Sequence, residues 1–380
     1  MAHVCRVTAI PFVDLRAQHL GIGEAVARAV ARVADSQQFI LGDEVRALEE
    51  TLASRFGVAA AVGVANGSDA LYLALRVAGV GPGDEVITTA LSFFATAGAI
   101  ARVSATPVFV DIEPEGLGID PDRVLAAVSS RTRAVVPVHL FGRCVRIEPL
   151  VSLSERHGFV LVEDAAQAID ATRGGRAAGS FGDFGCLSFH PTKNLGAWGD
   201  GGMVLCKSVT AAREVARLRA HGGADGVHEV VGINSRLDAL QAAILRAKLP
   251  QLAAWSHRRR ECAARYRELF FEAGLDGDVS VPRLDNDGVE VFHHFAIRCQ
   301  KRDALRAHLT DAGIGVGVYY PTPLHLQPCF AALGGRVGDC PVAERAALEL
   351  LSLPMFPELS HAQQTRVVAE IAVFYRGKRN

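Results

Sequence analysis

The sequence has 380 residues, of which 49% are hydrophobic and 21% are charged, and this composition is ordinary for a soluble globular enzyme. A chain of this length can bury a large core and is expected to divide into two domains. The formal net charge is −1, which gives no indication of a nucleic-acid or membrane-surface partner.

The cysteines and the apolar runs predict a cytoplasmic protein. The eight cysteines, Cys5 among them, are scattered without a C-x-x-C pair, and several lie in apolar runs. We interpret them as reduced core cysteines rather than a disulfide framework or a zinc site, and no metal site is predicted. The N-terminus lacks a charged segment followed by a long apolar stretch, and no apolar run reaches the length of a membrane span.

The N-terminal part of the chain predicts helices followed by a layered sheet. Residues 23–34 are alanine-rich and helical in pattern, and a second helix is expected to end at Phe56. From residue 59 to about residue 206, short β-branched runs alternate with helical stretches. This alternation favours a βα-type layered sheet.

The first strand–helix unit is a candidate anion site. A strand at residues 60–65 is followed by the turn Asn66–Asp69 and a helix that runs to Gly79. Free N–H groups and the helix dipole favour a phosphate at such a helix start. Gly67 permits close approach and Ser68 adds a hydroxyl donor, although the same residues also suit a plain helix N-cap.

The next strands bring an aromatic and an acidic candidate. Residues 91–96 follow a strand at 85–89 and enter a helix, where Phe93 could stack on a planar ring or lie in the core. The apolar run 159–162 is expected to be a buried parallel strand. It ends in Glu163–Gln167, where Asp164 could face a ligand at the carboxyl edge of the sheet or be solvated.

A glycine-rich loop at residues 188–202 carries a single lysine, Lys193, between two strand-like runs. Glycines allow the backbone to approach a ligand closely. With Trp198 nearby, the lysine could be partly desolvated, which would lower its pKa and make it a nucleophilic amine able to form a Schiff base. A solvated loop lysine is the alternative.

The C-terminal part predicts a long helix and a second domain. Residues 232–238 are expected to open the helix, with Ser235 and Asp238 spaced like a capping box, and Pro250 should kink or divide it before about residue 271. The expected elements that follow are a loop at 276–288, a strand near 291–299, and helices at 303–312, 342–351 and 361–374.

Four motifs in this order resemble the DegT/DnrJ/StrS family of sugar aminotransferases, which is part of the fold type I, aspartate-aminotransferase-like superfamily. They are NGSDAL (66–71), EDAAQ (163–167), SFHPTKNLG (188–196) and NSRLDALQAA (234–243). The resemblance covers nearly the whole chain, from residues 11–15 to residues 351–355.

The resemblance implies an α/β fold in two parts. The expected large domain, residues 1–250, has a mixed, mostly parallel central sheet flanked by helices. The expected small domain, residues 251–380, is α+β, and the segment up to about residue 35 is expected to pack with it.

The resemblance also implies roles around pyridoxal 5′-phosphate. Lys193 would form the Schiff base and, once displaced, move the proton to and from the substrate carbon. Asp164 would pair with the ring nitrogen, Gln167 would lie near the phenolic oxygen, and Phe93 would stack on the ring.

The remaining implied roles concern the phosphate and the substrates. Gly67, Ser68 and Ser188 would hold the phosphate, and Asn234 would reach in from the partner subunit of a homodimer with shared active sites. Arg236 is the candidate for the amino donor's carboxylate. The candidates for the substrate side are Tyr319, Tyr320 and His325.

The implied reaction is a ping-pong transamination. Glutamate would convert the cofactor to pyridoxamine phosphate, and a keto-sugar nucleotide would then take the amino group. Residues 319–328 and 351–355 resemble members that aminate C3 of a dTDP- or UDP-linked 3-keto hexose. The lysine at position 193 argues against the dehydratases of the group, in which it is replaced.

Three alternatives remain open from the sequence. The substrate could be an amino-cyclitol or aminobenzoate precursor, or the chain could be a non-catalytic regulatory member. A nicotinamide-dependent sugar dehydrogenase is disfavoured, because residues 79–84 place Asp84 at the third glycine of G-x-G-x-x-G and a strand follows.

Overall fold

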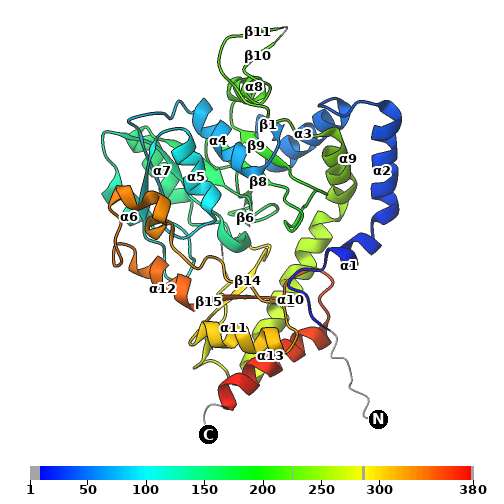
Figure 1. The fold of residues 1–380 in the computed structure, drawn as a ribbon, viewed down its shortest axis with the longest axis vertical. Helices are drawn as coiled ribbons and strands as arrows, with labels where there is room; N and C mark the ends of the chain where they lie inside the picture. Colours follow the sequence, from blue (N-terminus) through cyan, green and yellow to red (C-terminus); the bar gives the residue numbers. More distant parts are fainter. Residues whose placement is uncertain (1–8, 225, 285–286, 378–380) are drawn as a thin grey trace.

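A seven-stranded sheet forms the centre of the larger part of the molecule (Figure 1). The computed structural model describes residues 9–224, 226–284 and 287–377. The strand order is β1-β9-β8-β5-β4-β2-β3, and β9 runs antiparallel to its two neighbours while the other pairs are parallel. The strands are β1 (Ala60–Val64), β2 (Glu85–Thr89), β3 (Thr106–Val110), β4 (Thr132–Val136), β5 (Val160–Asp164), β8 (Phe184–Ser188) and β9 (Gly202–Cys206). The expected mixed, mostly parallel sheet is therefore confirmed.

Helices cover both faces of this sheet because its side chains alternate between two cores. Val204 packs with α4, α5 and α8, whereas Met203 and Leu205 pack with α3 and α9 on the opposite face, as the two-residue period of a strand requires. The helices of this part are α1 (Leu15–Leu20), α2 (Gly23–Ser36), α3 (Asp43–Phe56), α4 (Gly67–Val77), α5 (Phe94–Arg102), α6 (Pro121–Ala127), α7 (Glu148–His157), α8 (Val209–Leu218) and α9 (Ala239–Lys248).

The C-terminal part has its own core around a three-stranded antiparallel sheet of order β12-β14-β15. Its elements are α10 (Leu252–Glu272), β12 (Val279–Ser280), β14 (Phe295–Cys299), α11 (Arg302–Asp311), α12 (Pro341–Glu349), β15 (Leu350–Leu353) and α13 (His361–Arg376). Ile10 joins this core, and α2 packs on α9. The division at residue 250 and the packing of the first 35 residues remain predictions.

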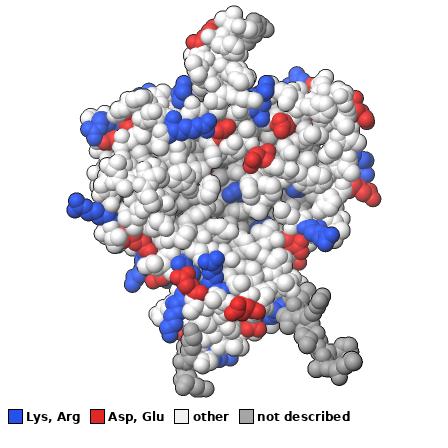
Figure 2. Space-filling view, in the orientation of Figure 1, with Lys and Arg blue, Asp and Glu red and all other residues white. Residues whose placement is uncertain are grey.

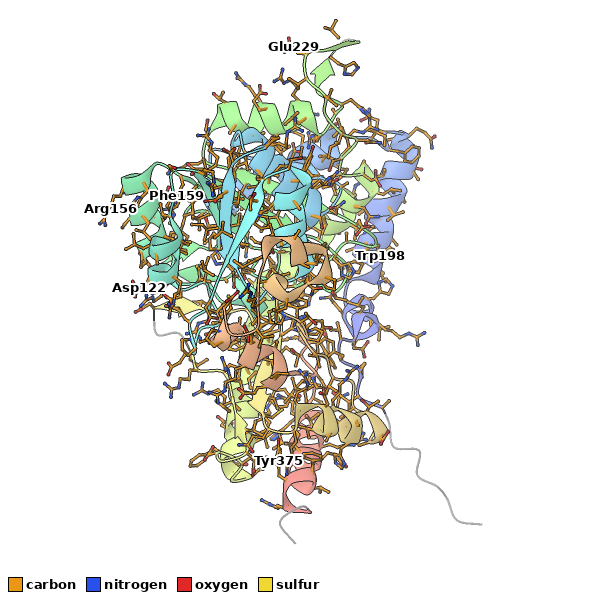
Figure 3. The ribbon with its side chains drawn as sticks, turned by 60° about the vertical axis from the view of Figure 1, so that its left-hand side comes forward. Asp122, Arg156, Phe159, Trp198, Glu229 and Tyr375 are labelled. Carbon is orange, nitrogen blue, oxygen red and sulfur yellow. The ribbon has the colours of Figure 1, made fainter. Side chains whose placement is uncertain are left out.

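Short elements decorate this frame. They are β6 (Thr172–Arg173), β7 (Arg176–Ala177) and β13 (Gly288–Val289), which form one small sheet, the hairpin strands β10 (Gly223–Ala224) and β11 (Val227–His228), and the 3-10 turns η1 (Leu140–Gly142), η2 (Leu249–Gln251), η3 (Leu324–Leu326) and η4 (Pro328–Leu333). The β10–β11 hairpin projects from the body of the molecule at the top of Figure 1, and Glu229, the residue after β11, is labelled there in Figure 3.

The long helix near the middle of the chain begins later than the sequence predicted. Residues 232–238 are not helical, and α9 starts at Ala239 without a side-chain cap. Ser235 instead accepts a hydrogen bond from the N–H of Ala65, so the predicted capping box is wrong because tertiary contact claims the hydroxyl. The predicted break of the long helix at Pro250 is confirmed, since the turn η2 separates α9 from α10.

The predicted helix at residues 342–351 also needs correction at its end. The helix α12 stops at Glu349, and Leu350 begins β15. Residues 350–353 pair with β14 in an antiparallel register. A short apolar run cannot be assigned to helix or strand from its periodicity, and pairing with a distant strand decides it here.

The charged surface and the free cysteines are those of an ordinary globular chain. Lys and Arg are interspersed with Asp and Glu on the face in Figure 2. The seven described cysteines are free, and all of them except Cys329 are buried; Cys5 lies outside the described residues. Within the described part of the chain, no helix combines the length and apolarity that a membrane crossing requires.

One edge of the central sheet gathers the candidate residues. The parallel strands β5 and β8 end there at Asp164 and Ser188. Because β9 runs in the opposite direction, it begins at this edge with Gly202, which pairs with both Ser188 and Val64. The start of α4, the lysine loop and Asp164 are therefore neighbours in space.

Candidate active site

A cavity of about 780 Å³ opens at this edge of the sheet. Its wall contains residues from the start of α4, the end of β5, the lysine loop and the C-terminal part. Of the predicted site residues, those that line it are Gly67, Ser68, Phe93, Asp164, Gln167, Ser188, Lys193, Tyr319 and Tyr320. The structure thus brings together nine residues that are spread over most of the sequence.

The loop that carries Lys193 has a fixed backbone. The N–H of Lys193 donates to the carbonyl of His190 at 2.8 Å, and the N–H of Ala197 donates to Phe189 at 2.8 Å. A Cβ at Gly196 would lie 2.3 Å from the Pro191 carbonyl oxygen, so the turn requires glycine. The loop presents one lysine from a rigid frame.

Lys193 is an amine poised for reaction. Burial lowers its pKa to about 8, and the negative charge of Asp164 opposes part of that effect. The neutral, nucleophilic form is therefore more populated near neutral pH than in an ordinary lysine. Trp198 is not the cause, because it packs against His19 and is half exposed; Figure 3 shows it beside the N-terminal helices. The predicted role of Trp198 in desolvation is wrong.

Asp164 is a buried carboxylate at the floor of the cavity, with 5% of its surface exposed. Burial raises its pKa, whereas hydrogen bonds from the Thr96 hydroxyl (2.8 Å) and the Ala166 N–H (3.2 Å) and the charge of Lys193 lower it. Burial is the largest effect, so the pKa of Asp164 stays above its ordinary value, while the two donors and the cation favour the ionised form. A carboxylate in this state can hold a protonated ring nitrogen.

A second buried pair, Glu163 and His139, holds the backbone next to Asp164. Glu163 accepts hydrogen bonds from the backbone N–H groups of Gly179, Phe181 and Gly182. The ring of His139 lies 2.8 Å from the same carboxylate through Nε2, and its Nδ1 accepts from Val145, so the ring proton lies on Nε2. The N–H of His139 also donates to the carbonyl of Asp164.

The start of α4 forms a cradle of backbone N–H groups. Asn66 caps the helix by accepting from the N–H of Asp69 at 2.8 Å, so the N-cap alternative holds for Asn66, while Gly67 and Ser68 face the cavity. A Cβ at Gly67 would lie 2.7 Å from the Cβ of Ser188. These residues can approach a phosphate together.

The side walls contain Gln167 and aromatic rings. Gln167 accepts from the N–H of Phe141 at 2.7 Å and donates to the hydroxyl of Tyr320 at 3.1 Å, so its orientation is fixed. Phe93 precedes α5, is 56% exposed and lies 5.8 Å from the ring of Tyr320. These two rings are placed to enclose a planar group.

Three of the predicted site residues do not line the cavity. Asn234 is exposed and pairs through its backbone with Ala220, and Arg236 is half buried, with a buried Nε that lacks a hydrogen-bond partner. His325 is buried and pairs with Glu344 at 3.1 Å. Within one chain, these side chains do not line the cavity that contains Lys193.

Sequence reasoning missed several residues that build the site. Thr96 and Ser92 form a buried hydrogen-bonded chain to Asp164, and Ser92, His293 and His294 line the cavity. The four-residue spacing of Ser92 and Thr96 at a helix start could have indicated a shared face. The two histidines precede β14, and nothing in their local pattern points to a site some hundred residues away.

The chemical groups around the cavity fit pyridoxal phosphate. Lys193 supplies an amine with a lowered pKa, Asp164 supplies a buried carboxylate, and glycine backbone at a helix start supplies a phosphate cradle. This donor set on a mixed α/β sheet defines the class of fold type I pyridoxal phosphate enzymes. Among the described residues, no group of three or more His, Cys, Asp or Glu side chains could hold a metal ion.

The chain belongs to the DegT/DnrJ/EryC1/StrS aminotransferase family, whose model matches residues 21–372. The expected family is thus confirmed. The cofactor expectation agrees with solved relatives in the pyridoxal phosphate and pyridoxamine phosphate forms.

Individual relatives match over almost their full length. The chain is 50% identical to a "Pleiotropic regulatory protein" of Geobacillus stearothermophilus, over 97% of this chain and 99% of that protein. It is 45% identical to a UDP-N-acetyl-3-dehydro-α-D-glucosamine 3-aminotransferase of Acidithiobacillus ferrooxidans, over 96% and 97%. Its fold matches that of S. venezuelae DesV, solved with a ketimine intermediate, with a TM-score of 0.93, 40% identity and coverage of 96% and 98%.

Proposed function

We propose that the protein transfers an amino group from glutamate to a keto-sugar nucleotide. The observation that carries this proposal is the placement of Lys193, Asp164 and the N-terminus of α4 around one cavity of about 780 Å³. A cavity of this size holds a cofactor together with part of a substrate.

Pyridoxal phosphate supplies an aldehyde that condenses with amines and a ring that accepts an electron pair. Lys193 would hold the aldehyde carbon as a neutral amine and, when released, would carry the proton to and from the substrate carbon. Asp164 would hold the proton on the ring nitrogen, and the hydrogen bond from Thr96 favours the ionised form of that carboxylate. Because its pKa is lowered to about 8, the amine of Lys193 can both accept and release a proton near neutral pH.

Other cavity residues orient the cofactor. Gly67, Ser68 and Ser188 hold the phosphate at the positive end of α4. Gln167 lies near the phenolic oxygen, with its amide fixed by Phe141 and Tyr320. Phe93 would stack on the ring and exclude water from that face.

We propose a 3-keto hexose linked to dTDP or UDP as the amino acceptor. The 45% identical relative is named as an aminotransferase of a 3-dehydro sugar carried on UDP, which supports amination at C3. Tyr319 and Tyr320 line the cavity on the side of the C-terminal part and contact the sugar. His325 acts on the substrate side indirectly. Its ring is hydrogen-bonded to Glu344, and this bond holds the loop that contains His325 in place.

We propose a homodimer in which each site uses both subunits. Asn234 lies on an exposed segment at the base of the projecting β10–β11 hairpin, where Val227 and Val231 are 66% and 86% exposed. Apolar side chains on such a projection favour burial against a partner. Asn234 then reaches the phosphate of the partner's cofactor, and Arg236 binds the donor carboxylate there.

Mixed subunits test the shared site. Lys193→Ala and Asn234→Ala variants, each inactive alone, are mixed after mild denaturation and refolding. Recovery of turnover supports the shared site, because one cavity of a mixed dimer has both native residues. A monomer in light scattering, or no recovery from dimers that do exchange, overturns it.

A regulatory role is the second candidate, because the 50% identical relative is named as a regulatory protein. The lysine, the buried aspartate and the fixed glutamine argue that chemistry is retained. We also propose a cytoplasmic location, in line with the free thiols of the described cysteines.

The deciding experiment uses the enzyme in its amine form. It is mixed with a panel of keto-sugar nucleotides and with keto-inositol, and the return of the aldehyde form is followed by absorbance. Return with a 3-keto sugar nucleotide supports the proposal, and return with keto-inositol alone selects the cyclitol alternative. Bound cofactor without any turnover supports the regulatory role. Borohydride reduction and peptide mapping should place the cofactor on Lys193.

A further inference from the structure

Asn194, the residue after Lys193, binds a segment from the far side of the cavity. Its Nδ2 donates to the carbonyl of Val291 at 3.0 Å, and its Oδ1 lies 3.2 Å from Nδ1 of His293. Asn194 is 3% exposed and His293 is 6% exposed. Residues 291–293 lead directly into β14, so this contact joins the lysine loop to the C-terminal part.

The hydrogen-bond pattern fixes the protonation of His293. The amide nitrogen of Asn194 must face the Val291 carbonyl, so its oxygen faces the imidazole and can only accept. Nδ1 of His293 therefore donates, and the proton of the neutral ring lies on that nitrogen. Burial, together with the nearby His294 and Lys193, lowers the pKa of His293 well below its ordinary value, which agrees with a neutral ring.

The contact is one of several that hold the lysine loop. At the other end of the loop, Lys248 from α9 donates to the carbonyl of Gly196 at 2.5 Å. The backbone next to Lys193 is tied within the loop to His190. Asn194 is thus the side chain adjacent to Lys193 through which the C-terminal part acts on the loop, and His293 lines the same cavity as Lys193.

We propose that His293 is a positioning residue for transamination, which holds Lys193 in its reactive place by donating a hydrogen bond to Asn194. This inference rests on the proposed function, because the position matters only if Lys193 reacts. A displacement of about 1 Å at a reacting group can cost about 100-fold in rate. The His293–Asn194 bond prevents such a displacement while the Lys193 side chain alone moves.

Two substitutions separate the hydrogen bond from the ring. His293→Leu removes the donor, and we expect kcat to fall about 100-fold with little change in KM. His293→Asn can place an amide N–H where Nδ1 lies, and we expect it to recover at least about tenfold of that loss. His308→Leu is the matched control, since His308 also makes one ring hydrogen bond, to Glu370, in the C-terminal part. It should retain the native rate.

A double substitution tests whether His293 acts through Asn194. If it does, His293→Leu combined with Asn194→Ala is no slower than the slower single variant, because both remove the same bond. Multiplicative losses would instead assign the two residues independent effects and overturn the proposal. A native kcat in His293→Leu would overturn it as well.

A readout without cofactor keeps this inference separate from the proposed function. In the cofactor-free enzyme, the labelling rate of Lys193 by an amine reagent should rise with pH around a midpoint of about 8. In His293→Leu, we expect the midpoint to move toward the ordinary lysine value, because a displaced side chain is better solvated. An unchanged midpoint overturns the positioning role, whereas absence of turnover in the native enzyme overturns only the proposed function.

Discussion

The hydroxyl of Thr96 donates a hydrogen bond to Oδ2 of Asp164 at 2.8 Å, and Ser92 lies 2.8 Å behind it in the same buried chain. Because Thr96 donates to the carboxylate, its oxygen accepts from Ser92. The chain opposes the effect of burial, which raises the pKa of Asp164. A helix start more than sixty residues away from Asp164 in sequence thus lowers its pKa against the effect of burial.

Thr96→Val should therefore weaken the electron-accepting role of the cofactor. Loss of the donor raises the pKa of Asp164, so the carboxylate becomes protonated at a higher pH than in the native enzyme. We expect kcat to fall about tenfold and the acid limb of the kcat/KM profile to move to higher pH. Thr96→Ser retains the hydroxyl and should behave as the native enzyme; equal profiles for Val and Ser would contradict this role.

Asp164→Asn should move the titration of Lys193. The negative charge of Asp164 raises the pKa of Lys193 and so offsets part of the effect of burial. Without that charge, we expect the labelling midpoint of the cofactor-free enzyme to drop below about 8. Labelling with mass-spectrometric detection of the Lys193 peptide measures it, and Lys193→Arg identifies the peptide. An unchanged midpoint would mean that Asp164 is neutral in the native enzyme.

Lys248→Met should change how stability depends on pH. Burial lowers the pKa of Lys248 to about 8 from 10.5, so between these values the unfolded chain binds more protons than the native one. The native contribution of Lys248 therefore increases as pH rises from about 8 toward 10.5. We expect the difference in Tm between the native enzyme and the variant, in favour of the native enzyme, to be larger at pH 9.5 than at pH 7.5. A difference that stays constant with pH would refute the lowered pKa of Lys248.

His139→Ala should destabilise the floor of the site. It removes the fully buried partner of Glu163 and leaves the N–H of Val145 without its acceptor. We expect a loss of about 3 kcal/mol in the free energy of unfolding in urea. His157→Ala, at the exposed end of α7, should cost less than about 1 kcal/mol. Similar losses in both variants would argue against the buried pair.

Gly202→Ala should weaken phosphate binding. A Cβ at this position would lie 2.4 Å from the carbonyl carbon and oxygen of Asn66, so the start of α4 must move. We expect the Kd for pyridoxal phosphate to rise about tenfold or more, measured by fluorescence or dialysis. Gly81→Ala, where an added Cβ meets nothing within 4 Å, is the control. An unchanged Kd in Gly202→Ala would place the phosphate elsewhere.

Local patterns were sufficient wherever one segment decides its own structure. Asp120 and Pro121 are an N-cap residue and a first-turn proline, which are typical of a helix start, and Asp120 does cap α6. The apolar run before Asp164 predicted a buried parallel strand, and β5 is one. Caps, prolines and continuous apolar runs act within a few residues, so the sequence reveals them directly.

Patterns failed where a distant segment decides the outcome. Ser235 was expected to cap a helix, but the N–H of Ala65 occupies its hydroxyl. Residues 350–353 became a strand because β14 lies beside them. Such competition between local and tertiary hydrogen bonds cannot be ranked from spacing alone.

The sequence by itself determined the motifs, their order and hence the family, because the glycine turns, the lysine and the strand-end aspartate each lie in a short recognisable stretch. The tertiary structure decided the electrostatics that make them work. Burial by many segments lowers the pKa of Lys193, and Thr96 and His293 reach the site from far away in the chain. Desolvation and long-range hydrogen bonds depend on the sum of all neighbours in space, which no single stretch of sequence contains.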